Sequence, residues 1–371
     1  MRPRDAAPVT PPPMTPSPTT PSTTPRLRTG LVLGKLLPPH LGHLYLVGCA
    51  LQQVERLYVV VEHVEDEPIP SELRVRWMRE LVPEATSLRV GGLSRRHILH
   101  LDRAMPQEPS AHPAFWELWR TTLKALVPEP IEAVFASETY GHRLAAELDA
   151  RFLPVDPARQ VMPVSGTVVR ADPSAHARFL PNPVRAHYGL PPREPRPAPR
   201  RVALVGPEST GKSTLARALA AHFDAYVVPE HAETMIAAGV CDPQALVTCD
   251  FEDFARGRRA SEETLASFGG ELLVCDSDAL TTQLYAERLL GSCPSWIAEE
   301  AATSAYDLTL FFSPDVPWQD DLHRVDRGGR EAFFARMQAA LRASGRRTVV
   351  LSGDWRARED AAIEACRALL T

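Results

Sequence analysis

Short apolar runs alternate with longer amphipathic runs along most of this chain. The apolar runs predict strands at 31–33, 57–61, 88–90 and 133–137, and again at 201–205, 225–228, 271–275, 306–312 and 348–351. Helical spacing predicts helices at 44–54, 71–81, 139–150, 214–222, 250–259 and 358–370. A repeated strand and helix is typical of a parallel sheet covered by helices. The pattern therefore predicts two α/β domains, each with a doubly wound parallel sheet.

Two proline-rich stretches divide the chain. Residues 1–28 are rich in Pro and Thr and nearly lack bulky apolar residues, so we predict a disordered tail. The tail lacks the apolar centre of a secretory signal; a transit peptide and a misplaced start codon are alternative interpretations. Residues 181–199 predict a semi-rigid linker. The predicted domains are therefore 29–180 and 200–371.

The second domain opens with the pattern G-x-x-x-x-G-K-[ST], placed between a predicted strand and a predicted helix. This arrangement aims backbone N–H groups and a helix N-terminus at phosphate. We expect Lys212 to reach the β- and γ-phosphates of a nucleoside triphosphate and Ser213 to bind Mg²⁺. The residues predicted to bind ATP here are Gly206, Glu208, Ser209, Thr210, Gly211, Lys212, Ser213 and Thr214.

Carboxylates follow two other predicted strands of this domain. The strand at 271–275 leads into Asp276 and Asp278, an arrangement in which Asp276 would act as a base or assist Mg²⁺. Either carboxylate can be the base at this stage, and Asp278 can also bind the phosphoryl acceptor. Glu230 follows the strand at 225–228, where it would meet the acceptor's hydroxyl groups or the metal.

The first domain has a glycine-containing loop of its own after the strand at 31–33. His40 and His43 lie three residues apart in an H-x-G-H pattern that opens the next helix, where imidazoles can donate hydrogen bonds to phosphate. Gly42 would let a nucleotide approach the backbone closely. A metal-binding pair is the alternative, but no third ligand is evident nearby. The loop begins with Gly34 and Lys35.

Two further segments of the first domain suggest ligand contacts. Trp116 and Trp119 would share one face of a helix, as core residues or as a platform for a planar, preferably cationic, ring. A later cluster of Ser165, Gly166, Thr167 and Arg170 can bind phosphate at a helix start. The arginines of the predicted helix 71–81, among them Arg74, are expected to form a solvated basic face.

Taken together, these segments resemble one family. The H-x-G-H loop and the segment from Ser165 to Arg170 resemble the two signatures of the nucleotidyltransferase superfamily. With the tryptophan pair and the P-loop, they resemble the bifunctional NadR type, in which a nicotinamide mononucleotide adenylyltransferase is fused to a ribosylnicotinamide kinase. The resemblance runs from residue 31 to the C-terminus. Some members of that family carry an N-terminal helix-turn-helix domain, and only the Pro/Thr tail is found at that position here.

The resemblance implies a Rossmann-like nucleotidyltransferase domain followed by a P-loop kinase domain. It also implies contacts from a segment near residue 320, although Leu322 departs from the glycine of the family pattern. Trp318 and Asp321 would then join Glu230 and Asp278 at nicotinamide riboside, and Arg324 and Arg327 would close on ATP. Trp116 and Trp119 would bind the nicotinamide nucleotide of the first domain, and the glycine loop and residues 165–170 would bind its ATP.

The implied chemistry forms NAD in two steps. The kinase would phosphorylate nicotinamide riboside with ATP and Mg²⁺, and the adenylyltransferase would join the mononucleotide to a second ATP. Neither step needs a protein nucleophile, because alignment and charge neutralisation suffice. His40, His43, Lys212 and Asp276 are the predicted catalytic residues. The implied partners are small molecules, and self-association into a homo-oligomer stays open.

Composition excludes several other classes. The net charge of −5 gives no general attraction to nucleic acid or anionic membrane, and no apolar run reaches the ~18 residues of a membrane span. Six scattered cysteines without C-x-x-C spacing favour reduced thiols and a cytoplasmic protein.

Two alternatives concern the domains separately. In one alternative the second domain is a GTPase switch, but the guanine-binding motif N-K-x-D does not occur. The first would be a non-catalytic nicotinamide-nucleotide sensor that regulates the kinase, but its histidine motif is intact.

Overall fold

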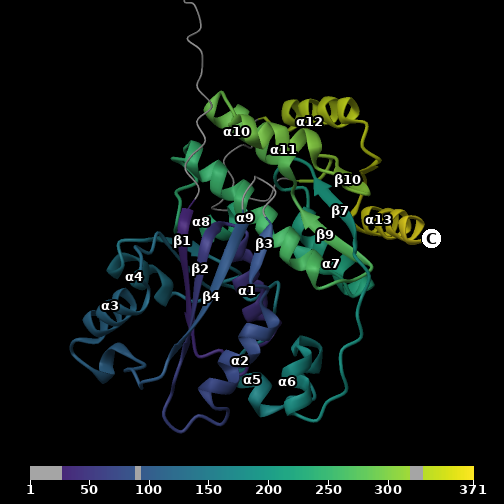
Figure 1. The fold of residues 1–371 in the computed structure, drawn as a ribbon. Coiled ribbons are helices and arrows are strands. Elements are labelled where there is room, and N and C mark those ends of the chain that lie inside the picture. The colour runs from purple at the N-terminus through teal and green to yellow at the C-terminus, as the bar shows by residue number, and fades with distance from the viewer. Residues whose placement is uncertain (1–26, 88–92, 318–328) are drawn as a thin grey trace, which may run out of the picture.

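The computed structural model describes residues 27–87, 93–317 and 329–371, which form two sheets with helices around each (Figure 1). The first sheet has the strand order β3-β4-β2-β1-β5-β6, parallel except for β3. Its strands are β1 (Leu27–Gly34), β2 (Val54–Glu62), β3 (Ala85–Ser87), β4 (Leu93–Leu101), β5 (Ala133–Ala136) and β6 (Arg151–Pro154). The chain leaves β1 in one direction to β2 and later returns on its other side to β5. The carboxyl end of β1 therefore lies at the switch point where open α/β sheets bind ligands.

Alternating side chains of β1 and β2 pack on opposite faces of this sheet. Val32 and Val59 join the cluster that includes α1, whereas Leu31 and Val60 join the cluster that includes α3 and α4. This two-residue period is the geometry of a strand buried on both faces. The helices of this half are α1 (Leu41–Leu51), α2 (Ser71–Leu81), α3 (Phe115–Leu126), α4 (Tyr140–Glu147), α5 (Gly166–Ala171) and α6 (Asn182–His187), with short 3₁₀ turns at Pro109–Ala111 and Ala177–Phe179.

The second sheet is parallel throughout, in the order β11-β10-β7-β9-β8. Its strands are β7 (Arg200–Val205), β8 (Tyr226–Val228), β9 (Leu272–Asp276), β10 (Leu308–Phe312) and β11 (Thr348–Leu351). Its helices are α7 (Lys212–Phe223), α8 (His231–Ala237), α9 (Thr248–Ser267), α10 (Ala279–Leu290), α11 (Ser295–Thr303), α12 (Arg330–Ser344) and α13 (Trp355–Leu370). The central strand β7 lies between β9 and β10, so the loop after β7 also lies at a switch point.

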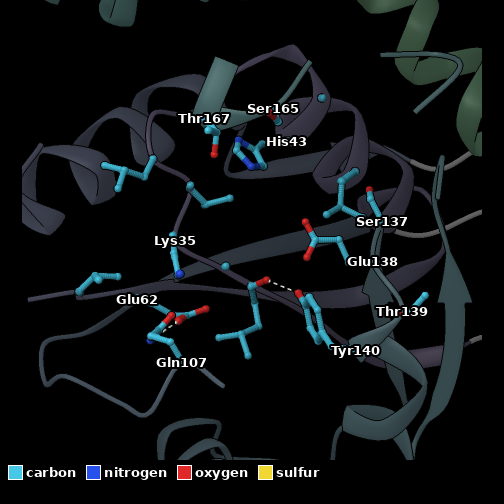
Figure 2. Close-up of a pocket in the computed structure, with 18 of the residues that line it drawn as sticks. Lys35, His43, Glu62, Gln107, Ser137, Glu138, Thr139, Tyr140, Ser165 and Thr167 are labelled. Carbon is cyan, nitrogen blue, oxygen red and sulfur yellow. Dashed lines mark hydrogen bonds between the residues drawn. The ribbon is translucent and has the colours of Figure 1, made fainter. Parts of the chain in front are cut away.

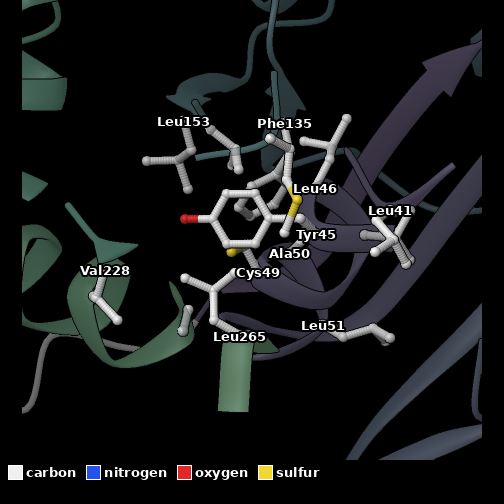
Figure 3. Close-up of a cluster of buried hydrophobic side chains, with 14 of the residues drawn as sticks. Leu41, Tyr45, Leu46, Cys49, Ala50, Leu51, Phe135, Leu153, Val228 and Leu265 are labelled. Carbon is white, nitrogen blue, oxygen red and sulfur yellow. The ribbon is translucent and has the colours of Figure 1, made fainter. Parts of the chain in front are cut away.

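One hydrophobic core runs through both halves. Tyr45, Cys49 and Phe135 of the first half lie in the same buried cluster as Val228 and Leu265 of the second (Figure 3). Helices α1 and α9 pack closely, since a Cβ added to Gly48 would lie 2.4 Å from Cγ2 of Thr264. The Tyr45 hydroxyl lies 2.5 Å from the hydroxyl of Ser261. The two halves are therefore packed against each other and not merely tethered.

The predicted fold class is confirmed. The sequence pattern missed β4 and β6, and β1 begins at Leu27, inside the stretch predicted to be a disordered tail. The predicted linker contains α6, whose Val184 is fully buried. The predicted strand at 88–90 and most of the predicted tail lie outside the described residues. None of the described helices is both long and apolar enough to cross a bilayer.

Candidate functional sites

A cavity of about 670 Å³ opens at the carboxyl end of β1 (Figure 2). The predicted residues that line it come from the loop after β1, the start of α1, the helix α3 and the start of α5. They are Gly34, Lys35, His40, Gly42, His43, Trp116, Trp119, Ser165, Gly166, Thr167 and Arg170. The fold thus brings together three segments that lie far apart in the sequence.

His40 and His43 form a stacked pair at the start of α1. Their ring centroids are 3.7 Å apart, and the backbone N–H of His40 points at Nδ1 of His43 at 3.4 Å. The pKa of His40 is lowered mainly by burial and further by His43 and Arg159. The pKa of His43 is lowered to about 3, mainly by burial and further by Arg159. Both rings are therefore neutral at pH 7. The two ring nitrogens of His40 are buried without a hydrogen-bond partner among the described residues, so they can meet a ligand.

Helix α5 brings the second predicted phosphate segment against the first loop. Ser165 caps the helix by accepting a hydrogen bond from the N–H of Val168 at 3.4 Å. A Cβ on Gly166 would lie 2.3 Å from the carbonyl oxygen of Leu37, so this contact requires glycine. Arg170 donates to the same carbonyl at 2.5 Å. Leu37 is thus the point where the two sequence segments meet.

The two tryptophans have different surroundings. Trp119 is 5% exposed and donates its indole N–H to the carbonyl of Pro106 at 3.0 Å, which fixes it as a wall of the cavity. Trp116 is half-buried, with the Arg143 guanidinium 5.7 Å from its ring centroid. Of the pair, Trp116 has the ring face better placed for a ligand.

The sequence analysis missed other residues that line this cavity. Glu62 ends β2 and is buried, and this burial raises the pKa of its carboxyl group, although Gln107 and Lys35 oppose the effect. Tyr140 donates to the carbonyl of Leu33 at 2.8 Å (Figure 2). A carboxylate at the end of a buried strand was the available signal for Glu62, since the same signal identified Asp276.

A second cavity, of about 640 Å³, lies over the loop after β7. The predicted loop residues that line it are Glu208, Ser209, Thr210, Gly211, Lys212, Ser213 and Thr214. Gly206 does not line the cavity; a Cβ there would lie 2.8 Å from Cβ of Phe312, so glycine lets the loop pack on β10. Gly211 precedes α7 with φ +88°, a conformation that favours glycine. The Lys212 ammonium donates to the carbonyl of Pro207 at 3.0 Å.

Two carboxylates meet the loop from the neighbouring strands β8 and β9. Asp276 is 3% exposed, and burial raises its carboxyl pKa, although Lys212 and then the nearby Ser213 hydroxyl oppose this shift. Glu230 lines the cavity, and burial is the main cause that raises its pKa to about 7. Lys212 opposes this shift, while Asp276 and two nearby glutamates add to it. Three glutamates, Glu208, Glu230 and Glu233, line the cavity together with four basic side chains, so it can meet both a positively charged group and phosphate groups.

Asp278 has a structural role instead of the predicted contact with the acceptor. It is fully buried, caps α10 by accepting from the N–H and hydroxyl of Thr281 at 2.7 Å each, and forms an ion pair with Arg346. Neither Asp278 nor Asp276 is among the residues that line the cavity, but Asp276 adjoins the P-loop, whereas Asp278 is held by Thr281 and Arg346. Trp318, Asp321, Arg324 and Arg327 lie outside the described residues.

Apolar and aromatic side chains that the sequence analysis did not single out complete the second cavity. Phe251 and Phe254 of α9 line it, as does His231 of α8. Burial lowers the pKa of His231 to about 4. Trp355 lines it beside Gly211 and is 40% exposed. A lining that contains both aromatic rings and carboxylates can accept a planar, cationic group.

The Ser213 and Asp276 pair fits Mg²⁺. Oδ1 of Asp276 is buried without a hydrogen-bond partner among the described residues, and both side chains offer the oxygen ligands that Mg²⁺ prefers. No group of three His, Cys, Asp or Glu side chains in the described part of the chain could hold a metal ion alone. This agrees with Mg²⁺ sites that use one or two protein oxygens and rely on phosphate for the rest.

Comparison with known proteins places the chain among relatives. Residues 201–358 match a family model described as an AAA domain. The chain is 24% identical over 310 residues to the trifunctional NAD biosynthesis/regulator protein NadR of Salmonella typhimurium, covering 79% of this chain and 70% of that protein. The Escherichia coli K12 protein of the same name is equally similar over 309 residues. A crystal structure of NadR in complex with NR has a TM-score of 0.41 at 21% identity, covering 93% of this chain and 97% of that one. The chain is homologous to NadR.

Proposed function

We propose that this chain makes NAD from nicotinamide riboside in two steps, one at each cavity. The P-loop half transfers the γ-phosphoryl group of ATP to the riboside 5′-hydroxyl, giving nicotinamide mononucleotide and ADP. The other half joins the mononucleotide to a second ATP, giving NAD and pyrophosphate. The homology to NAD biosynthesis proteins supports the overall role. The observation that supports the riboside assignment is the presence of three glutamates and several aromatic side chains in the lining of the kinase cavity, because the nicotinamide ring of this substrate is planar and cationic.

In the kinase step, the P-loop N–H groups and Lys212 bind the β- and γ-phosphates. Ser213 and Asp276 would hold Mg²⁺, which neutralises phosphate charge as the phosphoryl group is transferred. Three glutamates line the cavity, and Glu230, which burial and its acidic neighbours give a pKa of about 7, holds the 5′-hydroxyl and takes its proton as the new P–O bond forms. Phe251 and Phe254 pack against the acceptor.

In the adenylyl step, the mononucleotide phosphate attacks the α-phosphorus of ATP and pyrophosphate leaves. His40, His43 and Arg170 donate hydrogen bonds to the phosphates, and Lys35 adds positive charge as the leaving group develops. The neutral state of the histidines matters, because each ring then has one N–H to donate, and a bound anionic phosphate would raise the pKa values that burial lowers. Trp116 stacks on the nicotinamide ring.

One incubation tests both assignments. Purified protein is mixed with nicotinamide riboside, ATP and Mg²⁺, and the products are separated by chromatography. We expect the mononucleotide first and NAD afterwards. Accumulation of the mononucleotide without NAD would leave the first half as a nicotinamide-nucleotide sensor, and absence of both products from folded protein would refute the proposal.

Two variants assign each reaction to its cavity. Lys212→Ala should abolish riboside phosphorylation and retain NAD formation from added mononucleotide. His43→Ala should do the reverse. NAD formation that His43→Ala leaves unchanged would contradict the role assigned to the first cavity.

A further inference from the structure

The carbonyl groups of the P-loop need hydrogen-bond donors, and the P-loop motif does not specify all of them. Its N–H groups must point toward phosphate, so the carbonyl groups of the loop point the other way, into the protein. Buried carbonyl groups need hydrogen-bond donors. The Pro207 carbonyl accepts from Lys212 at 3.0 Å and from the Thr210 hydroxyl at 2.9 Å. The Thr210 carbonyl accepts from Nη1 of Arg358 at 3.1 Å. A donor from the last helix of the chain therefore supports the loop, from a side chain that also borders the cavity.

Arg358 ties this carbonyl to the rest of the site. Its Nε donates to the carbonyl of Gly353 at 2.9 Å, and its Nη2 donates to the carbonyl of Ser313 at 3.1 Å and to Asp315. Gly353 follows β11 and Ser313 follows β10, so one guanidinium connects the P-loop to the ends of two strands. The side chain is 1% exposed. These contacts spread over all three nitrogens and match the rigid fork of arginine, which lysine lacks.

Arg74 has the corresponding place in the first half. It is fully buried, contrary to the solvated basic face expected for the arginines of its helix. Its Nη1 donates to the carbonyl of Lys35 and, at 3.0 Å, to that of Glu62; its Nε donates to the carbonyl of Ile69 at 3.0 Å. Nη2 pairs with Glu67. Arg74 thus connects the loop after β1 to the end of β2, as Arg358 connects the P-loop to the ends of β10 and β11.

We propose that Arg358 and Arg74 are positioning residues, each of which holds a carbonyl of one nucleotide-binding loop so that the loop faces its phosphate groups correctly. This inference rests on the proposed function. Neither side chain needs to touch the substrate for this role. Because displacement of a bound group by about 1 Å can cost on the order of a hundredfold in rate, losing the fork should lower catalysis even in a folded protein.

The two activities of one chain provide the test. We would compare Arg358→Lys and Arg74→Lys with two exposed arginines as matched controls, Arg336→Lys and Arg76→Lys. Arg358→Lys should lower kcat/KM for ATP in riboside phosphorylation at least tenfold, change the KM for riboside less than twofold, and leave NAD formation unchanged. Arg74→Lys should lower NAD formation and leave phosphorylation unchanged. Both controls should match the parent protein.

Parallel loss of both reactions and of thermal stability in either variant would refute a positioning role and indicate a general structural one. Activity within twofold of the parent would also refute it. If Arg358→Lys fails to fold, Asp315→Asn removes one anchor of the same guanidinium at a partly exposed position and should raise the KM for ATP selectively; an unchanged KM would count against the proposal. If the parent protein phosphorylates no riboside, the proposed function fails, and binding of a non-hydrolysable ATP analogue then shows whether Arg358→Lys still weakens the P-loop.

Discussion

The contact between α1 and α9 predicts that one substitution, Gly48→Ala, destabilises the parent protein but stabilises a variant in which Thr264 is shortened. A Cβ at Gly48 would lie 2.4 Å from Cγ2, 2.9 Å from Oγ1 and 3.2 Å from Cβ of Thr264. Thr264 cannot easily retreat, because it is 5% exposed and its hydroxyl donates to the carbonyl of Ala260 at 2.7 Å. Gly48→Ala therefore forces the two helices apart or distorts one of them.

Two opposing effects set the magnitude. Alanine in a helix interior is favoured over glycine by about 1 kcal/mol, whereas overpacking a well-packed core costs about 1–3 kcal/mol. Gly48→Ala should therefore lower the free energy of unfolding by about 1 kcal/mol. In a Thr264→Ala background the two nearest atoms are gone and the nearest remaining one, Cβ, is 3.2 Å away, so the helix preference outweighs the reduced crowding and the same change should raise the free energy of unfolding by up to about 1 kcal/mol. The expected coupling energy is about 2 kcal/mol, within the usual range for residues in contact.

Urea unfolding of the parent, both single variants and the double variant measures this coupling. We expect one unfolding transition for the parent, because the core is shared between the halves. An effect of Gly48→Ala that is equal in both backgrounds, within about 0.5 kcal/mol, would show that the residues do not touch and would refute the packing of the halves described above.

Three other predictions concern the sites. In Gly257→Ala, the added Cβ would lie 1.9 Å from Nε2 of His231, so this ring, which lines the kinase cavity, has to shift; kcat/KM for riboside should fall while NAD formation from mononucleotide is unchanged. Binding of nicotinamide riboside without ATP or Mg²⁺, measured by calorimetry, should weaken as pH falls below about 7, because Glu230 then becomes neutral; Glu230→Gln should bind weakly at every pH. His43 and His231 have pKa values of about 3 and 4, below the 6.5 of the unfolded chain, so the unfolded state binds more protons between these values. Stability should therefore be full above pH 6.5 and fall as the pH drops toward 4, and this fall should be smaller in His43→Asn.

Local pattern was sufficient for the central parts of both sites. The P-loop and the H-x-G-H loop each lie within a few residues of a strand and a helix. The predicted strand and helix on either side therefore support the assignment of each motif as a phosphate-binding loop. Strand β4 was missed because Leu93–Leu101 carries two arginines and two histidines and lacks the apolar run of a buried strand, although it pairs with β2 along its length. Pairing with a strongly apolar neighbour outweighed its own weak preference.

Burial of polar residues was the main feature that pattern could not predict. Asp278 was assigned to the acceptor because it follows a strand, but it also lies three residues before Thr281, at the start of α10, where a carboxylate is a good cap. Its partner Arg346 lies 68 residues away, and nothing in the local sequence indicates that pair. Arg74 was expected at the surface for the same reason: charged residues on a helix usually are, unless a partner is available.

The buried arginines show why such residues escape a sequence motif. A phosphate-binding loop uses its N–H groups for the ligand, so its carbonyls have to be satisfied from the protein side. Some donors are local, since Thr210 and Lys212 both donate to the Pro207 carbonyl. Others come from distant elements: Arg358 lies 148 residues from Thr210, and Arg74 lies 39 residues from Lys35. Arginine suits this position because one side chain supplies several fixed donors and stays charged when buried. A motif describes the part of the loop that contacts the ligand, whereas the position of the loop also depends on the residues that hydrogen-bond its carbonyl groups.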